Sequence, residues 1–169
     1  VSGTCGRSGS ADVVFGTMAR LPVGSIFVDG CHGPSGNTPL PIDAAMLWFD
    51  VLVHTQPPRV LRTIVDRFVP ELPFVGVLFS RLGAVCGTQG NMRHLLDAGE
   101  LCLIFPEGIA GIQKPFKDRY RLQGWSVGHA EAALRHGVPV IPVAVIGSEE
   151  QWPQIGQIDR MRMFGAPYL

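Results

Sequence analysis

The sequence has no excess of charge of either sign. Its 14 Lys and Arg residues balance 14 Asp and Glu residues, so the formal net charge is zero, and only 17% of the residues are charged. A nucleic-acid-binding domain usually carries a basic field, and a chaperone-like segment often carries an acidic tail. Because the sequence has neither, we do not expect nucleic acid as a partner.

Long apolar runs and metal-binding cysteine patterns are also missing. No run reaches 18 apolar residues, the length that a membrane-spanning helix needs, and the Gly- and Ser-rich first ten residues lack the apolar region of a signal peptide. The four cysteines form no CxxC pair and have no His at zinc-ligand spacing. We therefore expect no metal site and no disulfide framework, with Cys86 and Cys102 as small buried hydrophobic residues.

The sequence is rich in apolar residues. They make up 46% of the chain, and the mean hydropathy is +0.23, so a sizeable core can form. Low charge leaves apolar surface as well, which often marks a partner or a membrane. We expect a single domain over residues 1–169, irregular over 1–20 and truncated at one or both ends.

Short apolar runs alternate with amphipathic segments along the chain. Continuous apolar strands that alternate with helices are typical of α/β domains. We predict an α/β fold with a mixed, largely parallel central sheet flanked by helices. The expected strands are 25–30, 59–67, 84–86, 101–106 and 138–147, and the expected helices are 41–54, 73–83, 90–99 and 126–137. The last strand is expected to be buried, although its Pro139 and Pro142 suggest a sheet edge or an irregular strand against a ligand.

Polar loops follow three of these strands, at residues 31–43, 106–123 and 147–156. Ligands of parallel sheets gather at the carboxyl ends of the strands. His32 follows the first strand, and a histidine is the commonest general base near neutral pH when a carboxylate orients it. Asp43, at the start of the next helix, is the candidate carboxylate. A loop histidine beside a solvated aspartate is the alternative interpretation.

Glu107 directly follows the strand 101–106 and precedes Gly108, which permits an unusual backbone angle or the close approach of a ligand. A turn acid that caps the next segment is the alternative. The chain then becomes basic and aromatic, which suits a membrane interface or a nucleotide tail as well as a solvated loop. The residues concerned are Lys114, Phe116, Lys117, Arg119, Tyr120, Arg121 and Trp125. We expect the histidines at positions 54, 94 and 136 to lie at the surface.

Together these segments resemble the PlsC-like glycerolipid acyltransferases of the lysophospholipid acyltransferase superfamily, and most nearly their monoacylglycerol/diacylglycerol acyltransferase-like branch. The resemblance covers roughly Ile26 to Leu169. It rests on His32 followed by Asp43, on FPEG at Phe105–Gly108 and on GVPVIPVAVIG at Gly137–Gly147, in the order that the family shows.

The resemblance implies a PlsC-like fold and an O-acyl transfer. His32 would be the general base, Asp43 would orient it, and Glu107 with Gly108 would help to bind the glycerol portion of the acceptor. The implied substrate-binding residues are Phe105, Pro106, Glu107, Gly108, Lys114, Arg119 and Arg121.

The implied acyl donor is an acyl-CoA or an acyl-carrier protein, and no other cofactor is implied. The implied acceptor is a hydroxyl of a glycerolipid or another lipid alcohol. A membrane surface is the expected partner, with the protein on its cytoplasmic face, either peripheral or anchored by a segment absent from this sequence. Acyl-thioester hydrolysis and non-catalytic binding of lipid or acyl chains stay open as alternatives.

The chain departs from the family pattern in two respects. The family usually has four or five residues between His and Asp, whereas the loop-forming PSGNTP lengthens the interval between His32 and Asp43. Gln89 stands where the family has a phosphate-binding Arg, and Ala110 stands where an Arg is common. Because both changes remove guanidinium groups that bind phosphate, we expect a neutral acceptor such as mono- or diacylglycerol.

Overall fold

The computed structural model describes residues 22–29, 42–67, 69–71, 74–112, 116–118 and 121–145. The strands are β1 (Ser25–Asp29), β2 (Leu61–Val65), β3 (Val85–Cys86), β4 (Leu101–Ile104) and β5 (Val140–Val143). The helices are α1 (Ile42–His54), α2 (Val75–Arg81), α3 (Gln89–Asp97), α4 (Gly108–Ile112) and α5 (Gly128–His136), with two 3-10 turns, η1 (Val69–Glu71) and η2 (Phe116–Asp118). The predicted irregularity of residues 1–20 lies outside the described ranges.

The strands form one sheet in the order β3-β2-β4-β1-β5, and all of its pairs are parallel. The predicted α/β fold with a largely parallel sheet is therefore confirmed. Parallel neighbours need helical crossovers, which explains why a helix lies between each strand and the next.

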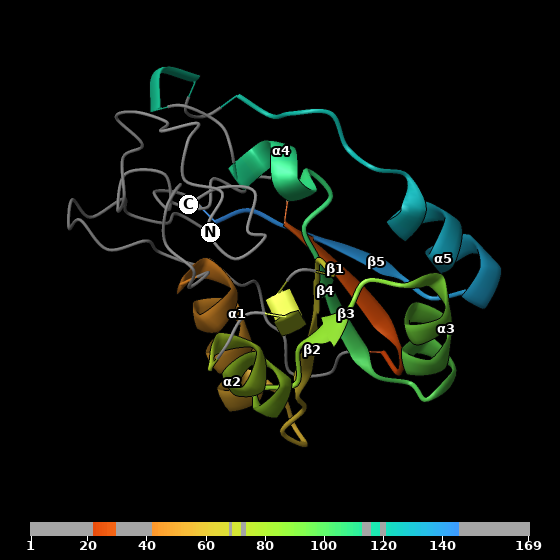
Figure 1. The fold of residues 1–169 in the computed structure, drawn as a ribbon. Coiled ribbons are helices and arrows are strands. Elements are labelled where there is room, and N and C mark those ends of the chain that lie inside the picture. Colours follow the sequence, from red (N-terminus) through yellow and green to blue (C-terminus); the bar gives the residue numbers. More distant parts are fainter. Residues whose placement is uncertain are drawn as a thin grey trace, which may run out of the picture.

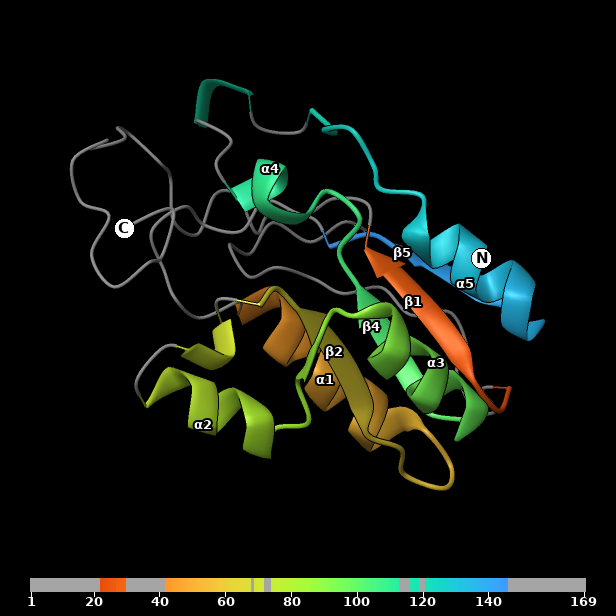
Figure 2. The same ribbon diagram turned by 45° about the vertical axis from the view of Figure 1, so that its right-hand side comes forward.

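Side chains alternate between the two faces of the sheet, and each face is covered by helices (Figures 1 and 2). Phe27 of β1 packs with Leu47 and Val51 of α1 on one face. Its neighbours Ile26 and Val28 pack on the other face with residues of α3 and α5. Because both faces are covered, the two central strands, β4 and β1, consist almost entirely of buried residues.

The edge position predicted for the last strand is confirmed, since β5 pairs with β1 alone among the described strands. Pro142 lies opposite Val28 and has no N–H to donate, which an edge strand tolerates. The expectation that this strand is buried was wrong. Its residues are alternately exposed and half-buried, because an edge strand shares less of the helical cover.

Glycines end two helices where the sequence predicted it. Gly137 follows α5 with a φ of +61°, and Gly99 lies two residues beyond α3 with a φ of +73°. Glycine adopts these left-handed angles at little cost, so the helix stops and the chain turns into the next strand.

The segment after β4 differs from its prediction. A loop was expected over residues 106–123, whereas α4 and η2 form within it. Gly108 has a φ of +54°, so the chain turns sharply as it enters α4. Figures 1 and 2 place α4 beyond the carboxyl ends of β1 and β4. This end of the sheet is called the carboxyl edge below, and the opposite end is called the amino edge.

Candidate functional site

The topology makes one position on the carboxyl edge a candidate ligand site. β1 and β4 are neighbours in the sheet, but the chain leaves them toward opposite faces. The connection from β1 forms α1 on one face, and the connection from β4 leads to α5 on the other. Ligands of open α/β sheets commonly bind beyond the strand ends at such a switch point.

The residues of the predicted His–Asp pair follow β1 in the sequence. His32 lies three residues beyond the end of β1, outside the described residues. Asp43 lies in the first turn of α1, and its side chain is also outside the description. The meeting of the two side chains therefore stays a prediction. Lys114 and Arg119 lie outside the described residues as well.

Glu107 is the acidic side chain that the structure buries at the carboxyl edge. It is only 4% exposed, and its Oε1 accepts a hydrogen bond from the backbone N–H of Gln123 at 3.1 Å. Its Oε2 is buried without a hydrogen-bond partner. Leaving a buried carboxylate oxygen unmatched is costly, so such a group requires an explanation. The carboxylate bonds a residue far along the chain, which argues against the capping alternative.

A backbone segment crosses beside Glu107, and we call residues 121–127 the strap. Gln123 donates its N–H to Glu107, and Ser126 donates its N–H to the carbonyl oxygen of Pro106 at 2.9 Å. The two bonds fix the strap against the turn that follows β4. Sequence reasoning did not identify Gln123 or Ser126, because backbone donors leave no pattern in the sequence.

The other predicted binding residues around Glu107 have different positions. Phe105 packs against the core on the α1 face, and Pro106 is buried. Gly108 is exposed, and there is open space where a Cβ would lie. Arg121 begins the strap with an exposed side chain, and its Nη1 lies 3.5 Å from Asp118 Oδ1.

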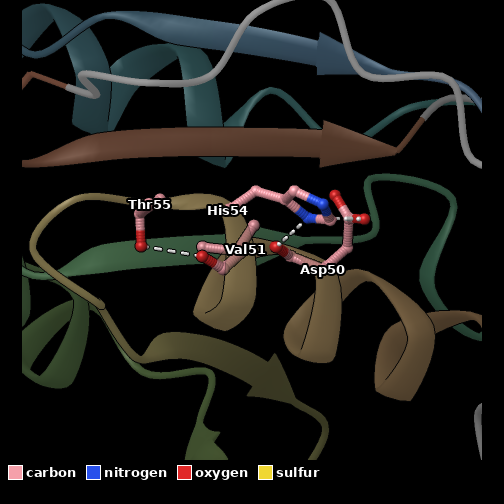
Figure 3. A network of polar contacts seen from close by, with 4 residues as sticks. All are labelled: Asp50, Val51, His54 and Thr55. Carbon is pink, nitrogen blue, oxygen red and sulfur yellow. Dashed lines mark hydrogen bonds and ion pairs between the residues drawn. The ribbon is translucent and has the colours of Figure 1, made fainter.

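A histidine–aspartate pair is present in α1, but at the amino edge. His54 Nδ1 lies 3.1 Å from Asp50 Oδ1 and 3.0 Å from the Asp50 carbonyl oxygen (Figure 3). α1 carries the chain from the carboxyl end of β1 back toward the start of β2. His54 is the last residue of this helix, so the pair cannot reach the Glu107 site.

A second pair also lies at the amino edge. His136, the last residue of α5, has its Nδ1 2.9 Å from Oδ1 of Asp97, the last residue of α3. The surface positions predicted for His54 and His94 are confirmed. The prediction for His136 was wrong, because its side chain is only 16% exposed and joins two helices.

The amino edge is closed by its own hydrogen bonds. Thr55 donates its hydroxyl to Val51 and accepts from the N–H of Arg59, and Figure 3 shows the first of these contacts. The Arg59 guanidinium donates to the carbonyl oxygens of Pro22 and Gly99 at 3.0 and 2.5 Å. The bonds of Thr55 and Arg59 are satisfied, but Oδ2 of Asp50 is, like Oε2 of Glu107, buried without a hydrogen-bond partner.

Cys102 lies in the interior of the sheet and is fully buried, as predicted. Burial, followed by the nearby Glu100 carboxylate, raises the pKa of its thiol to about 11, and Arg62 partly opposes this rise. Cys86 is half-buried, and both thiols are free. Among the described residues, no three His, Cys, Asp or Glu side chains cluster as metal ligands would, and no helix is long and apolar enough to cross a membrane.

Known proteins match most of this chain. The curated relatives include an uncharacterized protein of Mycobacterium tuberculosis, 40% identical over 134 residues, and one of Mycobacterium leprae, 39% identical over the same length. Both matches cover 77% of this chain, with 37% and 36% of the respective relatives. A mouse protein named "DGAT1/2-independent enzyme synthesizing storage lipids" is 25% identical over 139 residues, which cover 82% of this chain and 40% of that protein.

This chain therefore spans between a third and a half of the length of these curated relatives. No solved structure gives a significant match. The model of the family described as Acyltransferase matches residues 37–146, which is well over half of the chain. The match includes Asp43 and the FPEG turn, and it begins after His32. The resemblance to PlsC-like acyltransferases is thus confirmed, and the chain belongs to the Acyltransferase family.

Proposed function

We propose that this protein is an O-acyltransferase that moves a fatty acyl group from an acyl thioester to a hydroxyl of a glycerolipid or another lipid alcohol. Membership of the Acyltransferase family supports the reaction type. The name of the mouse relative, a storage-lipid enzyme, supports a lipid acceptor. The donor is acyl-CoA or an acyl-carrier protein, and the enzyme works at the cytoplasmic face of a membrane.

The observation that carries this proposal is the unmatched Oε2 of Glu107 at the switch point between β1 and β4. A buried carboxylate oxygen is a strong acceptor for a hydroxyl group, because a hydrogen bond to a charged group outweighs a neutral one. A hydroxyl of the acceptor would supply the missing hydrogen bond. Oε1 stays bonded to Gln123, which holds the carboxylate in a fixed orientation.

In this mechanism His32 takes the proton of the acceptor hydroxyl, and the oxygen attacks the thioester carbonyl carbon. The carbon–sulfur bond then breaks, and the thiolate leaves with the proton from the imidazolium. Asp43 fixes the tautomer of His32 and stabilises its charged form. The parallel pairing of β1 and β4 supports this proposal, because His32 follows the end of β1 by three residues and Glu107 follows the end of β4 by three residues.

The acceptor is proposed to be neutral, for example mono- or diacylglycerol. Gln89, in the position of the family's phosphate-binding Arg, begins α3 three residues after β3 ends. Ala110, where an Arg is common, is an exposed residue of α4. An amide and a methyl group cannot replace the paired N–H donors with which a guanidinium binds phosphate.

The test is to incubate the protein with radiolabelled long-chain acyl-CoA, with and without diacylglycerol, and to follow free CoA and lipid products. New acylglycerol supports transfer, whereas release of CoA that does not depend on an acceptor supports hydrolysis. Binding of acyl-CoA without turnover would refute both enzymatic functions.

A pair of histidine variants tests the general base. His32→Ala is expected to lower the rate at least about a hundredfold, the usual contribution of a general base. His94→Ala, which removes an exposed histidine of α3, is the matched control and is expected to leave the rate unchanged. A His32→Ala rate equal to that of the parent would remove His32 from the mechanism.

A further inference from the structure

The strap exposes an unusual set of side chains for a segment without helix or strand. Leu122 is 58% exposed, Trp125 is 45% exposed and Val127 is 75% exposed. Arg121, at its start, is also exposed. Large apolar groups so close together on a surface commonly mark a binding partner or a membrane.

The strap is held in place despite its irregular backbone. Besides the two hydrogen bonds to Glu107 and Pro106, the ring of Trp125 makes an edge-on contact with His129 of α5, with 6.2 Å between the ring centroids and 73° between the planes. In Figure 1 the strap is the open teal segment that runs along the outside of the molecule to α5. Its apolar side chains are therefore displayed from a fixed backbone beside the candidate site.

The chemistry of the strap fits a lipid bilayer better than the nucleotide tail of a donor. Tryptophan and arginine favour the boundary between headgroups and acyl chains, while leucine and valine favour the acyl region itself. Leu122 and Val127 offer no polar group to a nucleotide.

We propose that the strap inserts into the surface of the bilayer, with Leu122, Trp125 and Val127 in the outer acyl region and Arg121 among the lipid phosphates. The inference rests on the proposed function, because insertion of the strap turns the carboxyl edge and Glu107 toward the bilayer that holds the lipid acceptor. The acceptor then reaches the site without passing through water.

Exposed apolar side chains also lie on other elements, including the helices α1 and α2, and those of α1 serve as a control. Phe49 and Val53, one turn apart on α1, are exposed too, but it is the strap that two backbone hydrogen bonds join to the Glu107 turn. If exposed apolar residues alone determined membrane binding, this helix face would compete with the strap. Continuity with the site favours the strap.

A fluorescence experiment locates Trp125 directly. Replacing Trp48 and Trp152 with Phe leaves Trp125 as the sole tryptophan of the chain. Vesicles contain phosphatidylcholine and phosphatidylglycerol in equal parts, with bromine on the acyl chains. We expect a blue shift and quenching of Trp125 on binding. Emission that vesicles neither shift nor quench would overturn the proposal.

Two double variants measure binding by vesicle flotation. Leu122→Ser with Val127→Ser is expected to weaken partitioning at least about tenfold, since two apolar side chains no longer insert. Phe49→Ser with Val53→Ser is expected to change it less than about twofold. Thermal melts check that both variants fold. Equal partitioning of the strap variant and the parent, or an equal loss in the α1 variant, would overturn the proposal.

Activity assays separate this inference from the proposed function. The strap variant is expected to lose transfer to diacylglycerol in vesicles but to keep transfer to diacylglycerol dispersed in detergent. Loss of both would show that the strap acts on turnover itself and would overturn its assignment to the membrane. If the parent transfers no acyl group to diacylglycerol in vesicles or in detergent, the acyltransferase proposal fails. The quenching and flotation experiments still decide whether the strap binds the membrane.

Discussion

Replacing Glu107 with Gln separates a substrate-binding role of this carboxylate from a structural one. The Gln side chain has the same shape, and its carbonyl oxygen can still accept from the N–H of Gln123. The change replaces Oε2, the oxygen without a partner, with a neutral NH₂ group. The variant therefore keeps the contact that the structure shows and alters the atom that is available to a ligand.

The two roles predict different magnitudes. A hydrogen bond to a charged group contributes about 1.5–3 kcal/mol, so its loss is expected to lower kcat/KM for the acceptor by about 10- to 150-fold. Stability is expected to move little or to rise, because an unmatched amide group is cheaper to bury than an unmatched carboxylate oxygen. We expect the free energy of unfolding of Glu107→Gln to be unchanged or higher by about 1 kcal/mol.

The measurements are initial rates against acceptor concentration at fixed acyl-CoA, and urea unfolding of the same samples. Glu131→Gln is the matched control, because Glu131 is exposed on α5 and pairs with Arg135 at 2.6 Å. The control is expected to leave kcat/KM unchanged. The reasoning is refuted if Glu107→Gln retains the parent kcat/KM, or if it loses more than about 2 kcal/mol of stability, the size expected for loss of a structural anchor.

Two further predictions concern stability. Folding raises the pKa of the Cys102 thiol from 9.0 to about 11, so this thiol ionises first in the unfolded chain as the pH rises. About 3 kcal/mol of stability, fully present below pH 9, should therefore be lost between pH 9 and pH 11. Urea unfolding across that range should show a smaller decline in the free energy of unfolding for Cys102→Ala than for the parent. An identical decline in both proteins would contradict the role given to Cys102. Cys86→Ala is the control and should decline as the parent does. Gly137→Ala is expected to lower the free energy of unfolding by about 1–2 kcal/mol, since its φ is +61° although a Cβ would meet open space. Gly128→Ala, at a site that is equally open but has no positive φ, should leave the free energy of unfolding unchanged or raise it in the same urea experiments. An equal loss of stability in both variants would show that the backbone angle of Gly137 is not the cause.

The sequence predicted the fold well where local patterns determine structure. The apolar runs predicted β1 and β4, and Gly99 and Gly137 predicted the ends of α3 and α5. α4 was missed because five residues with a glycine at the first and fourth positions carry little helical signal. The burial of β5 was overestimated, because an edge strand and a central strand can have the same apolar composition.

The candidate site was predictable only in part. Glu107 could be identified because an acid directly after a buried strand must lie at the carboxyl edge. Its bond to Gln123, sixteen residues away, could not be identified, because any residue except proline has a backbone N–H. The pairing of His136 with Asp97 likewise joins two helices that are distant in sequence, and neither residue has a local pattern that indicates it.

The two hydrogen bonds that fix the strap have a consequence for how this enzyme can change. Both use the backbone N–H groups of the strap, so the side chains of residues 121–127 play no part in either bond. Evolution or a designed library can therefore vary the exposed positions of the strap, and with them the surface that it prefers, while Glu107 stays in place. Proline at position 123 or 126 is the exception, because it would remove a donor. In the strap, the exposed side chains can therefore vary, whereas the backbone positions that bond Glu107 and Pro106 must keep their geometry.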